Sequence, residues 1–211
     1  VHVNPHHVKK SKELDDNNPN KNDRKDPKTI AALVNEGRFS YPYIPTGIYA
    51  EVRSLSNLRF QTQEELTRIK NRIARWFSIY FPEYKDVYVD LKAVSGRMVL
   101  KAAPLPEDIV KLGAEGVNQI WRNAKLRGAG MKRAKTLVSV AEHSIGSKEA
   151  PEAARIELKN LLNDMDVYAA RLEELLRSIE EKLKEIPYID KLMAIKGIGP
   201  VSYTHLRAHE T

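Results

Sequence analysis

The sequence predicts a mainly α-helical protein, and three observations lead to that prediction. Apolar residues recur with helical spacing from about residue 48 to residue 80, and again from residue 151 to about residue 186. Glycine and proline interrupt the chain between these runs, which is typical of short helices joined by turns. Aromatic residues make up 7% of the chain against 42% for all hydrophobic residues, so we expect an aliphatic core.

Composition narrows the classes of function. With 211 residues the chain can hold one large domain or two small ones. Lysine and arginine number 35 against 28 acidic residues, a balance of +7 that favours a polyanionic partner without requiring one. The absence of cysteine excludes disulfides, thiolate metal sites and a cysteine nucleophile. No membrane span or signal peptide is recognisable, so we expect a cytoplasmic protein with no membrane partner.

The stretch Lys21 to Pro27 places two acids, Asp23 and Asp26, three residues apart in front of an apolar-periodic run. Pro27 suits the first turn of a helix, Asp26 can cap that helix, and Gly37 is expected to end it. If the helix begins a few residues earlier, the two carboxylates share one face and could hold a divalent cation. The alternative is a capped helix start with ordinary surface charges, and the D-x-x-D spacing does not separate the two.

The residues before this stretch are expected to lack helical structure. Residues 1–3 are interpreted as the end of a strand, and the polar run 15–20 as a loop. His2, His6 and His7 have no carboxylates at fixed spacing around them, so we expect no metal site there. Because Val1 is not an initiator methionine, we expect the natural N-terminus to be missing.

The first long helix is expected from about Ile48 to Tyr80. Its apolar stripe consists of Leu55, Leu58, Leu66, Ile69, Ile73 and Phe77. Arg68, Arg72 and Arg75 form a basic ridge that could neutralise phosphates without reading base sequence; the alternative is a solvated face balanced by nearby glutamates. The aromatic residues at its end could stack on bases, but packing in the core is favoured because they continue the apolar stripe.

Short helices with glycine stops are predicted between residues 104 and 147, whereas residues 87–103 are compatible with either an extended segment or a helix. Leu105 and Pro106 suit a helix start, and the turns are expected at Gly113, Gly116, Gly128 and Gly130. Basic residues surround the last two glycines: Lys125, Arg127, Lys132, Arg133 and Lys135. A glycine turn lets backbone amides approach a phosphate, so this cluster is a candidate nucleic-acid contact. No G-x-x-x-x-G-K-[ST] spacing supports use of ATP.

A second long helix is predicted to run unbroken from Leu158 to Ile186. Its heptad seam consists of Leu158, Leu162, Met165, Ala169, Leu172, Leu176, Ile179, Leu183 and Ile186. Neighbouring apolar residues widen the stripe, so the helix is expected to meet more than one partner. It either pairs with a second protomer or folds back on its own chain.

The end of the chain divides into two parts. Gly197 and Gly199 form a Gly-Ile-Gly turn similar to that of a helix-hairpin-helix, whose amides face a DNA phosphate. Residues 201–211 show no helical stripe and are interpreted as a non-native tail of adaptor origin, which we exclude from functional argument.

A set of short motifs, in one order along almost the whole chain, resembles a known transposase family. The motifs are Asn4-Pro5, Val8-Lys9, Lys21 to Pro27, Ile30-Ala31, Tyr43-Ile44-Pro45, Asn71-Arg72, Leu105-Pro106-Glu107-Asp108, Leu112-Gly113, Ile186-Pro187-Tyr188 and Ile195 to Pro200. They resemble the "one-ten" insertion-sequence family of DEDD transposases, in which a RuvC-like domain works with a bridge RNA.

The resemblance implies an order of domains. Residues 1–145 would be the C-terminal part of an RNase H/RuvC-like α/β domain whose first strands precede Val1. Residues 151–187 would be a coiled-coil helix, and residues 188–200 the start of a helix-hairpin-helix transposase domain. The sequence would then be an internal fragment of a transposase.

The resemblance also implies the chemistry. Four carboxylates of a RuvC-like site hold two metal ions, and the match places the last two at Asp23 and Asp26. The other two, and the serine nucleophile of the second domain, would lie outside this sequence. We therefore expect recombination that depends on Mg²⁺ in the parent protein, no tight metal binding here, and a fragment that is inactive alone.

The implied partners are DNA and a guide RNA, with a homo-oligomer formed through the coiled-coil helix and a place near the prokaryotic nucleoid. Two alternatives remain open at this point. One is a helical nucleic-acid-binding module whose D-x-x-D is only a cap, and the other is a coiled-coil scaffold that binds no nucleic acid.

Overall fold

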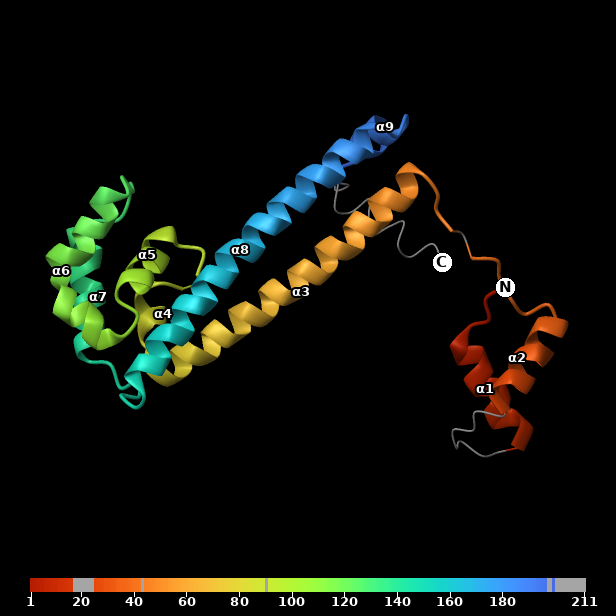
Figure 1. The fold of residues 1–211 in the computed structure, drawn as a ribbon, viewed down its shortest axis with the longest axis horizontal. Coiled ribbons are helices and arrows are strands. Elements are labelled where there is room, and N and C mark those ends of the chain that lie inside the picture. The colour runs from red at the N-terminus through yellow and green to blue at the C-terminus, as the bar shows by residue number, and fades with distance from the viewer. Residues whose placement is uncertain (17–24, 43, 90, 197–198, 200–211) are drawn as a thin grey trace. The chain divides into compact units, whose positions relative to one another are not determined.

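The computed structural model describes residues 1–16, 25–42, 44–89, 91–196 and 199. Within these residues the chain forms helices α1 to α9, and a single antiparallel bridge between His2 and Ser40 is its one strand-like pairing (Figure 1). The predicted mainly α-helical class is confirmed. The contacts divide the chain into two compact units, Val1–Ser54 with Lys182–Thr211, and Leu55–Glu181.

Helix α1 (Pro5–Asp16) corrects the prediction that residues 1–20 contain no helix. Its start follows a standard capping pattern, because Asn4 Oδ1 accepts a hydrogen bond from the His6 backbone N–H at 2.9 Å and Pro5 occupies the first helical position. Lys10 pairs with Glu13 one turn later, at 3.0 Å. The helix is polar and packs against α2, so its stability depends on tertiary contact that an apolar pattern does not reveal.

Helix α2 (Lys25–Asn35) ends as predicted but begins earlier. Gly37 has φ +74°, and the Arg38 and Gly37 amides donate to the Leu33 and Val34 carbonyls at 2.8 and 3.0 Å, which is the pattern of a Schellman motif. Because the helix already includes Lys25, Asp26 lies in its first turn, and its predicted role as the cap is wrong.

Helices α3 (Ile48–Tyr80) and α8 (Pro151–Lys184) are the two long elements. In the unit Leu55–Glu181 they lie side by side (Figure 1), and the Trp76 indole N–H donates to the Ala154 carbonyl at 3.0 Å. The two helices contribute to one buried core, with Leu66, Ile69, Ile73 and Phe77 from α3 and Leu158, Leu161, Leu162 and Met165 from α8. The heptad seam was expected either to pair with a second protomer or to fold back on its own chain. Its first half packs against α3 of the same chain.

Two details of the long helices differ from prediction. Leu58 is 49% exposed although it was assigned to the apolar stripe of α3. Helix α8 has no break, but it ends at Lys184 rather than Ile186. Pro187 disfavours helical backbone at the residue before it, Ile186, which is consistent with the earlier end of the helix. Although Ile186 lies outside the helix, its side chain is buried as the seam predicted, with 1% exposed.

The segment between the long helices folds into four shorter ones. Helices α4 (Tyr84–Val87) and α5 (Val94–Ala102) settle the open assignment of residues 87–103 as mainly helical. Helix α6 (Pro106–Asn123) begins at the predicted proline and is kinked at Gly113, where φ is 70°. Gly116, by contrast, lies inside α6, so the predicted turn there is wrong. Helix α7 (Met131–Glu142) follows Gly130, and Ile109, Val117, Trp121 and Leu137 are fully buried between these helices.

The second half of the first unit contains the short helix α9 (Ile189–Met193). The hydroxyl groups of Tyr49 and Tyr188 lie 3.0 Å apart in this unit, so the start of α3 contacts the chain just before α9. In the part of the chain that the structure describes, no helix combines the length and the apolar character that crossing a membrane requires.

Candidate acidic site and basic surfaces

Asp26 lies on the face of α2 that packs against α1. Residues three and seven positions further on, Thr29 and Leu33, are buried on this face, as helical spacing requires. The ammonium of Lys12, on α1, lies 2.6 Å from Asp26 Oδ1, and the Lys12 side chain is only 11% exposed while that of Asp26 is 37% exposed. A short charge-assisted hydrogen bond between α1 and α2 therefore already neutralises this carboxylate.

The described residues do not make up a metal site. Among them, no three histidine or acidic side chains gather closely enough to hold a metal ion. Asp26 is a suitable oxygen ligand for Mg²⁺, but its Oδ1 is taken by a cation, and Asp23 lies outside the described residues. With Lys12 beside it, Asp26 alone does not make a site for a divalent cation.

The basic ridge of α3, Arg68, Arg72 and Arg75, is exposed along its length. Arg68 contacts Glu65 on the same helix, and Arg72 lies 3.9 Å from Glu157 on α8. Arg75 has no acidic partner within 4.0 Å among the described residues. Exposed ion pairs of this kind are weak, so a phosphate can displace the glutamates and the ridge can bind a polyanion.

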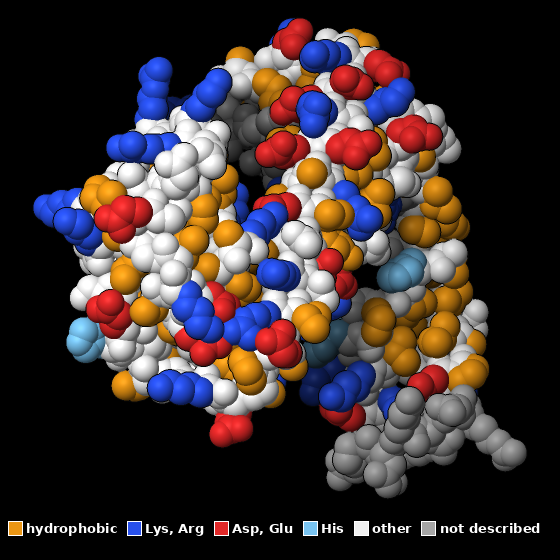
Figure 2. Space-filling model, turned by 60° about the vertical axis from the view of Figure 1, so that its left-hand side comes forward, with side chains coloured by type: hydrophobic (Ala, Val, Ile, Leu, Met, Phe, Trp, Pro, Cys, Tyr) orange, Lys and Arg blue, Asp and Glu red, His pale blue; other side chains and the backbone are white. Residues whose placement is uncertain are grey.

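The second candidate surface is the α7 cluster, Lys132, Arg133 and Lys135. All three side chains are exposed in the first turns of α7, which begins after Gly128 and Gly130. The Arg133 guanidinium lies 5.6 Å from the centre of the Tyr88 ring, a cation–π contact that fixes its position. Lysine and arginine side chains project together at the upper left of the space-filling view (Figure 2).

Helix α7 is held against the end of α3 by the segment that follows it. Glu83 accepts hydrogen bonds from the Ile145 amide at 2.9 Å and the Ser144 hydroxyl at 2.7 Å. Burial alone would raise the pKa of Glu83, but these two hydrogen bonds hold it below its ordinary value. The Ser147 amide donates to the Ile79 carbonyl at 2.7 Å, so the connection to α8 closes on α3.

The start of α8 is tied to the start of α6 by one arginine. Arg155 donates two hydrogen bonds to Asp108, at 2.9 and 2.8 Å, and also contacts Glu107 and Glu152. Asp108 in turn accepts the Leu105 amide at 3.2 Å. Burial alone would raise the pKa of Asp108, but the Arg155 and Leu105 hydrogen bonds and the Arg155 charge hold it below its ordinary value.

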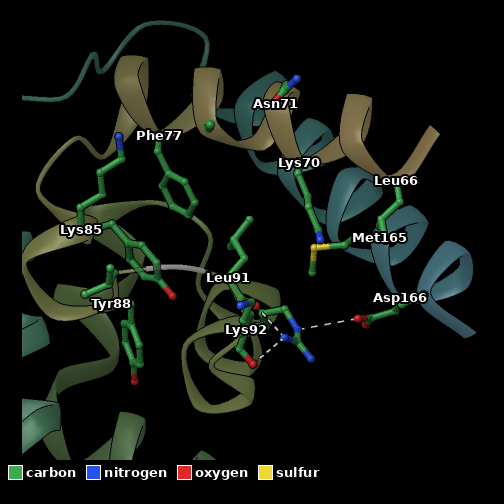
Figure 3. A pocket seen from close by; sticks show the side chains of 15 residues that line it. Leu66, Lys70, Asn71, Phe77, Lys85, Tyr88, Leu91, Lys92, Met165 and Asp166 are labelled. Atoms are coloured by element: carbon green, nitrogen blue, oxygen red, sulfur yellow. Dashed lines mark hydrogen bonds and ion pairs between the residues drawn. The ribbon is translucent and has the colours of Figure 1, made fainter. Parts of the chain in front are cut away.

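A cavity of about 460 Å³ lies between α3, the α4–α5 segment and α8 (Figure 3). Sequence reasoning did not find it, because its residues come from three segments far apart in the chain. Its walls are mainly apolar, with lysine and arginine at the rim.

The predicted phosphate-binding turn at the C-terminal end cannot be placed, because Gly197 lies outside the described residues and Gly199 is described without its neighbours. Of the described candidates, Asp26 belongs to the first unit and the two basic groups belong to the second.

Residues 1–82 match the family model of the IS110-type DEDD transposases, which is described as "Transposase". This match confirms the resemblance to the IS110-type transposases over these residues, which are fewer than half of the chain. No curated protein matches the chain. The matched residues 1–82 include α1, α2 and all of α3. They therefore include Asp23, Asp26 and the basic ridge of α3. The α7 cluster and the Gly197–Gly199 turn lie beyond it.

Proposed function

We propose that this chain is part of a DNA transposase of the IS110 family and that Asp23 and Asp26 are two of its four catalytic carboxylates. The observation that carries the proposal is the family match over residues 1–82, which includes both acids. The position of Asp26 in the first turn of a helix, with its side chain 37% exposed, keeps it within reach of a substrate.

The proposed reaction is metal-dependent cleavage and exchange of DNA strands during transposition. Mg²⁺ bound by the complete site would stabilise charge on the reacting phosphate oxygens. Within residues 1–211 the resemblance assigns only two of the four carboxylates, and it does not assign the serine nucleophile. We therefore propose that this chain alone binds Mg²⁺ weakly and does not recombine DNA.

The proposed nucleic-acid contacts are the basic ridge of α3 and the α7 cluster, with Gly197 and Gly199 as a further phosphate contact. The exposed arginines and lysines can neutralise backbone phosphates, but nothing about them reads bases. We propose that base pairing with a guide RNA selects the target, as the resemblance implies. The domain limits 1–145, 151–187 and 188–200, the RuvC-like and helix-hairpin-helix folds, and an oligomer through α8 remain predictions.

Salt dependence of binding tests the nucleic-acid part of this proposal. The wild-type chain should bind duplex DNA or structured RNA, and the logarithm of its affinity should fall steeply with the logarithm of salt concentration. Arg72→Gln combined with Arg75→Gln should flatten the slope by about one unit per lost phosphate contact, whereas Lys159→Gln, at an exposed site on α8, serves as the control. No detectable binding, or an affinity insensitive to salt, would favour a coiled-coil scaffold instead.

A non-catalytic nucleic-acid-binding module is the second candidate, and one observation favours it. The ion pair between Lys12 and Asp26 gives the acid a structural use that needs no metal. Replacing Asp26 in a complete transposase separates the two candidates. Recombination should persist if this chain is only a binding module, and it should be lost if Asp26 is catalytic.

A further inference from the structure

The cavity beside α3 combines apolar walls with a basic rim. Leu66, Phe77, Leu91 and Met165 contribute apolar side chains from three segments (Figure 3). The Arg97 guanidinium donates to the Leu91 and Lys92 carbonyls at 2.6 and 3.0 Å. These hydrogen bonds fix the segment before α5 as one wall, so the cavity is built into the fold.

Charge at the rim is predominantly positive. Lys70, Lys85, Lys92 and Arg97 all line the cavity, and Asp166 is the acid among its described lining residues. Asp166 is already neutralised, because Lys101 lies 2.5 Å and Arg97 3.7 Å from its oxygens. Lys70 has no acidic partner within 4.0 Å in the described part of the chain, and its side chain extends from α3 toward the cavity (Figure 3).

These features specify the kind of ligand. A volume of about 460 Å³ is within the range of small-ligand sites. The apolar walls suit a flat, weakly polar body, and the lysines suit an attached anion. A nucleotide has both parts, but in a duplex its base is stacked and paired and is not free to enter a pocket. The ligand must therefore be unpaired.

We propose that this cavity binds one unpaired nucleotide of a single-stranded nucleic acid, with the base against the apolar walls and its phosphate at Lys70 and Lys85. The inference rests on the proposed nucleic-acid function and adds a preference for single strands to it. The basic ridge and the α7 cluster hold the backbone of any nucleic acid, whereas this cavity requires a free base.

Two labelled oligonucleotides of equal length test the proposal with the full chain: an oligothymidylate and an abasic strand that carries the same phosphates without bases. Ala74 is exposed on α3 and lines the cavity, so Ala74→Phe fills the space without changing charge. Ala170→Phe, at an exposed alanine of α8 outside the cavity, is the matched control. Circular dichroism confirms that each variant is folded.

The wild-type chain and Ala170→Phe should bind oligothymidylate roughly fivefold or more tightly than the abasic strand, and Ala74→Phe should lose that preference. Lys70→Gln should weaken binding of both strands. Equal affinity of the wild-type chain for the two strands, or a preference that survives in Ala74→Phe, would overturn the proposal. Salt-dependent binding of duplex DNA measured in parallel would show that the proposed function stands even then.

An acidic protein segment is the other ligand that a basic rim could accept. If a polyglutamate peptide binds the wild-type chain and loses affinity selectively in Ala74→Phe, while oligothymidylate does not, the nucleotide proposal is overturned in favour of a protein partner.

Discussion

The ammonium of Lys12 lies 2.6 Å from the Oδ1 atom of Asp26, across the contact between α1 and α2. The lysine thus places a cation at Asp26, the one described acid that we propose as a catalytic carboxylate. This relationship has two consequences: it fixes the orientation of Asp26, and it opposes the approach of a second cation.

Replacing Lys12 should therefore strengthen metal binding at Asp26. Repulsion between a lysine and a divalent ion about 5 Å apart, screened by water and salt, corresponds to roughly a three- to tenfold change in affinity. We expect Lys12→Met to bind Mn²⁺ more tightly than the wild-type chain by that factor, as measured by electron paramagnetic resonance of the free ion. Lys10→Met, which removes a lysine paired with Glu13, is the control. An unchanged or lower affinity in Lys12→Met would show that the ammonium does not occupy the cation's place.

Gly146 should tolerate no side chain. A Cβ atom there would lie 2.1 Å from the Tyr80 carbonyl oxygen, and the neighbouring Ser147 amide is held by Ile79, so the backbone cannot move away easily. We expect Gly146→Ala to lower the free energy of unfolding by about 2 kcal/mol, as expected for overpacking, in urea titrations. Gly130→Ala, where a Cβ meets no atom within 4 Å, should change it little. Equal midpoints for the two variants would contradict the close contact.

Asp108 should make stability depend on pH in the acid range. Its pKa is held below the ordinary 3.8 in the folded state, so its contribution is present above 3.8 and is lost as pH falls through the folded-state value. Asp108→Asn should melt several degrees lower than the wild-type chain at neutral pH, and the difference should shrink below pH 3.8. Glu115→Gln, at an exposed acid, provides the comparison. A difference that stays constant with pH would exclude an ionic role for Asp108.

The packing of α8 on α3 predicts a large effect at Leu162, which is fully buried. Leu162→Ala should cost about 2–5 kcal/mol of unfolding free energy, because it leaves a cavity in the core. Val167→Ala on the same helix removes a side chain that is 48% exposed and should cost far less. Similar losses for the two variants in urea titrations would mean that the seam is not packed within the chain.

The long elements could be predicted from the sequence because their signals are local. Helix α3 was predicted from Ile48 to Tyr80, where the structure places it, since thirty-three residues of apolar periodicity outweigh any single exception such as Leu58. The end of α2 at Gly37 was also predictable from a local signal. A residue with left-handed backbone conformation commonly ends a helix, and glycine adopts that conformation most easily.

The features that were missed depend on contacts between distant residues. Helix α1 is too polar to show an apolar stripe and is stabilised by its Asn4 cap and by α2. The pair of Lys12 and Asp26 spans fourteen residues, and the Asp108–Arg155 pair spans forty-seven. The cavity beside α3 likewise needs the turns that place α4, α5 and α8 around it. No residue spacing in the sequence contains that information.

Recombination by a complete transposase that contains this sequence tests the central claim most directly. Asp26→Asn and Asp23→Asn, alone and together, should abolish strand exchange in the presence of Mg²⁺ while nucleic-acid binding is retained, because only the proposed metal ligands are removed. Asp164→Asn, at an exposed acid of α8, should recombine normally. If the Asp23→Asn, Asp26→Asn double variant exchanges DNA strands at the parental rate, the two acids are not catalytic, and Asp26 serves only to hold α2 against α1.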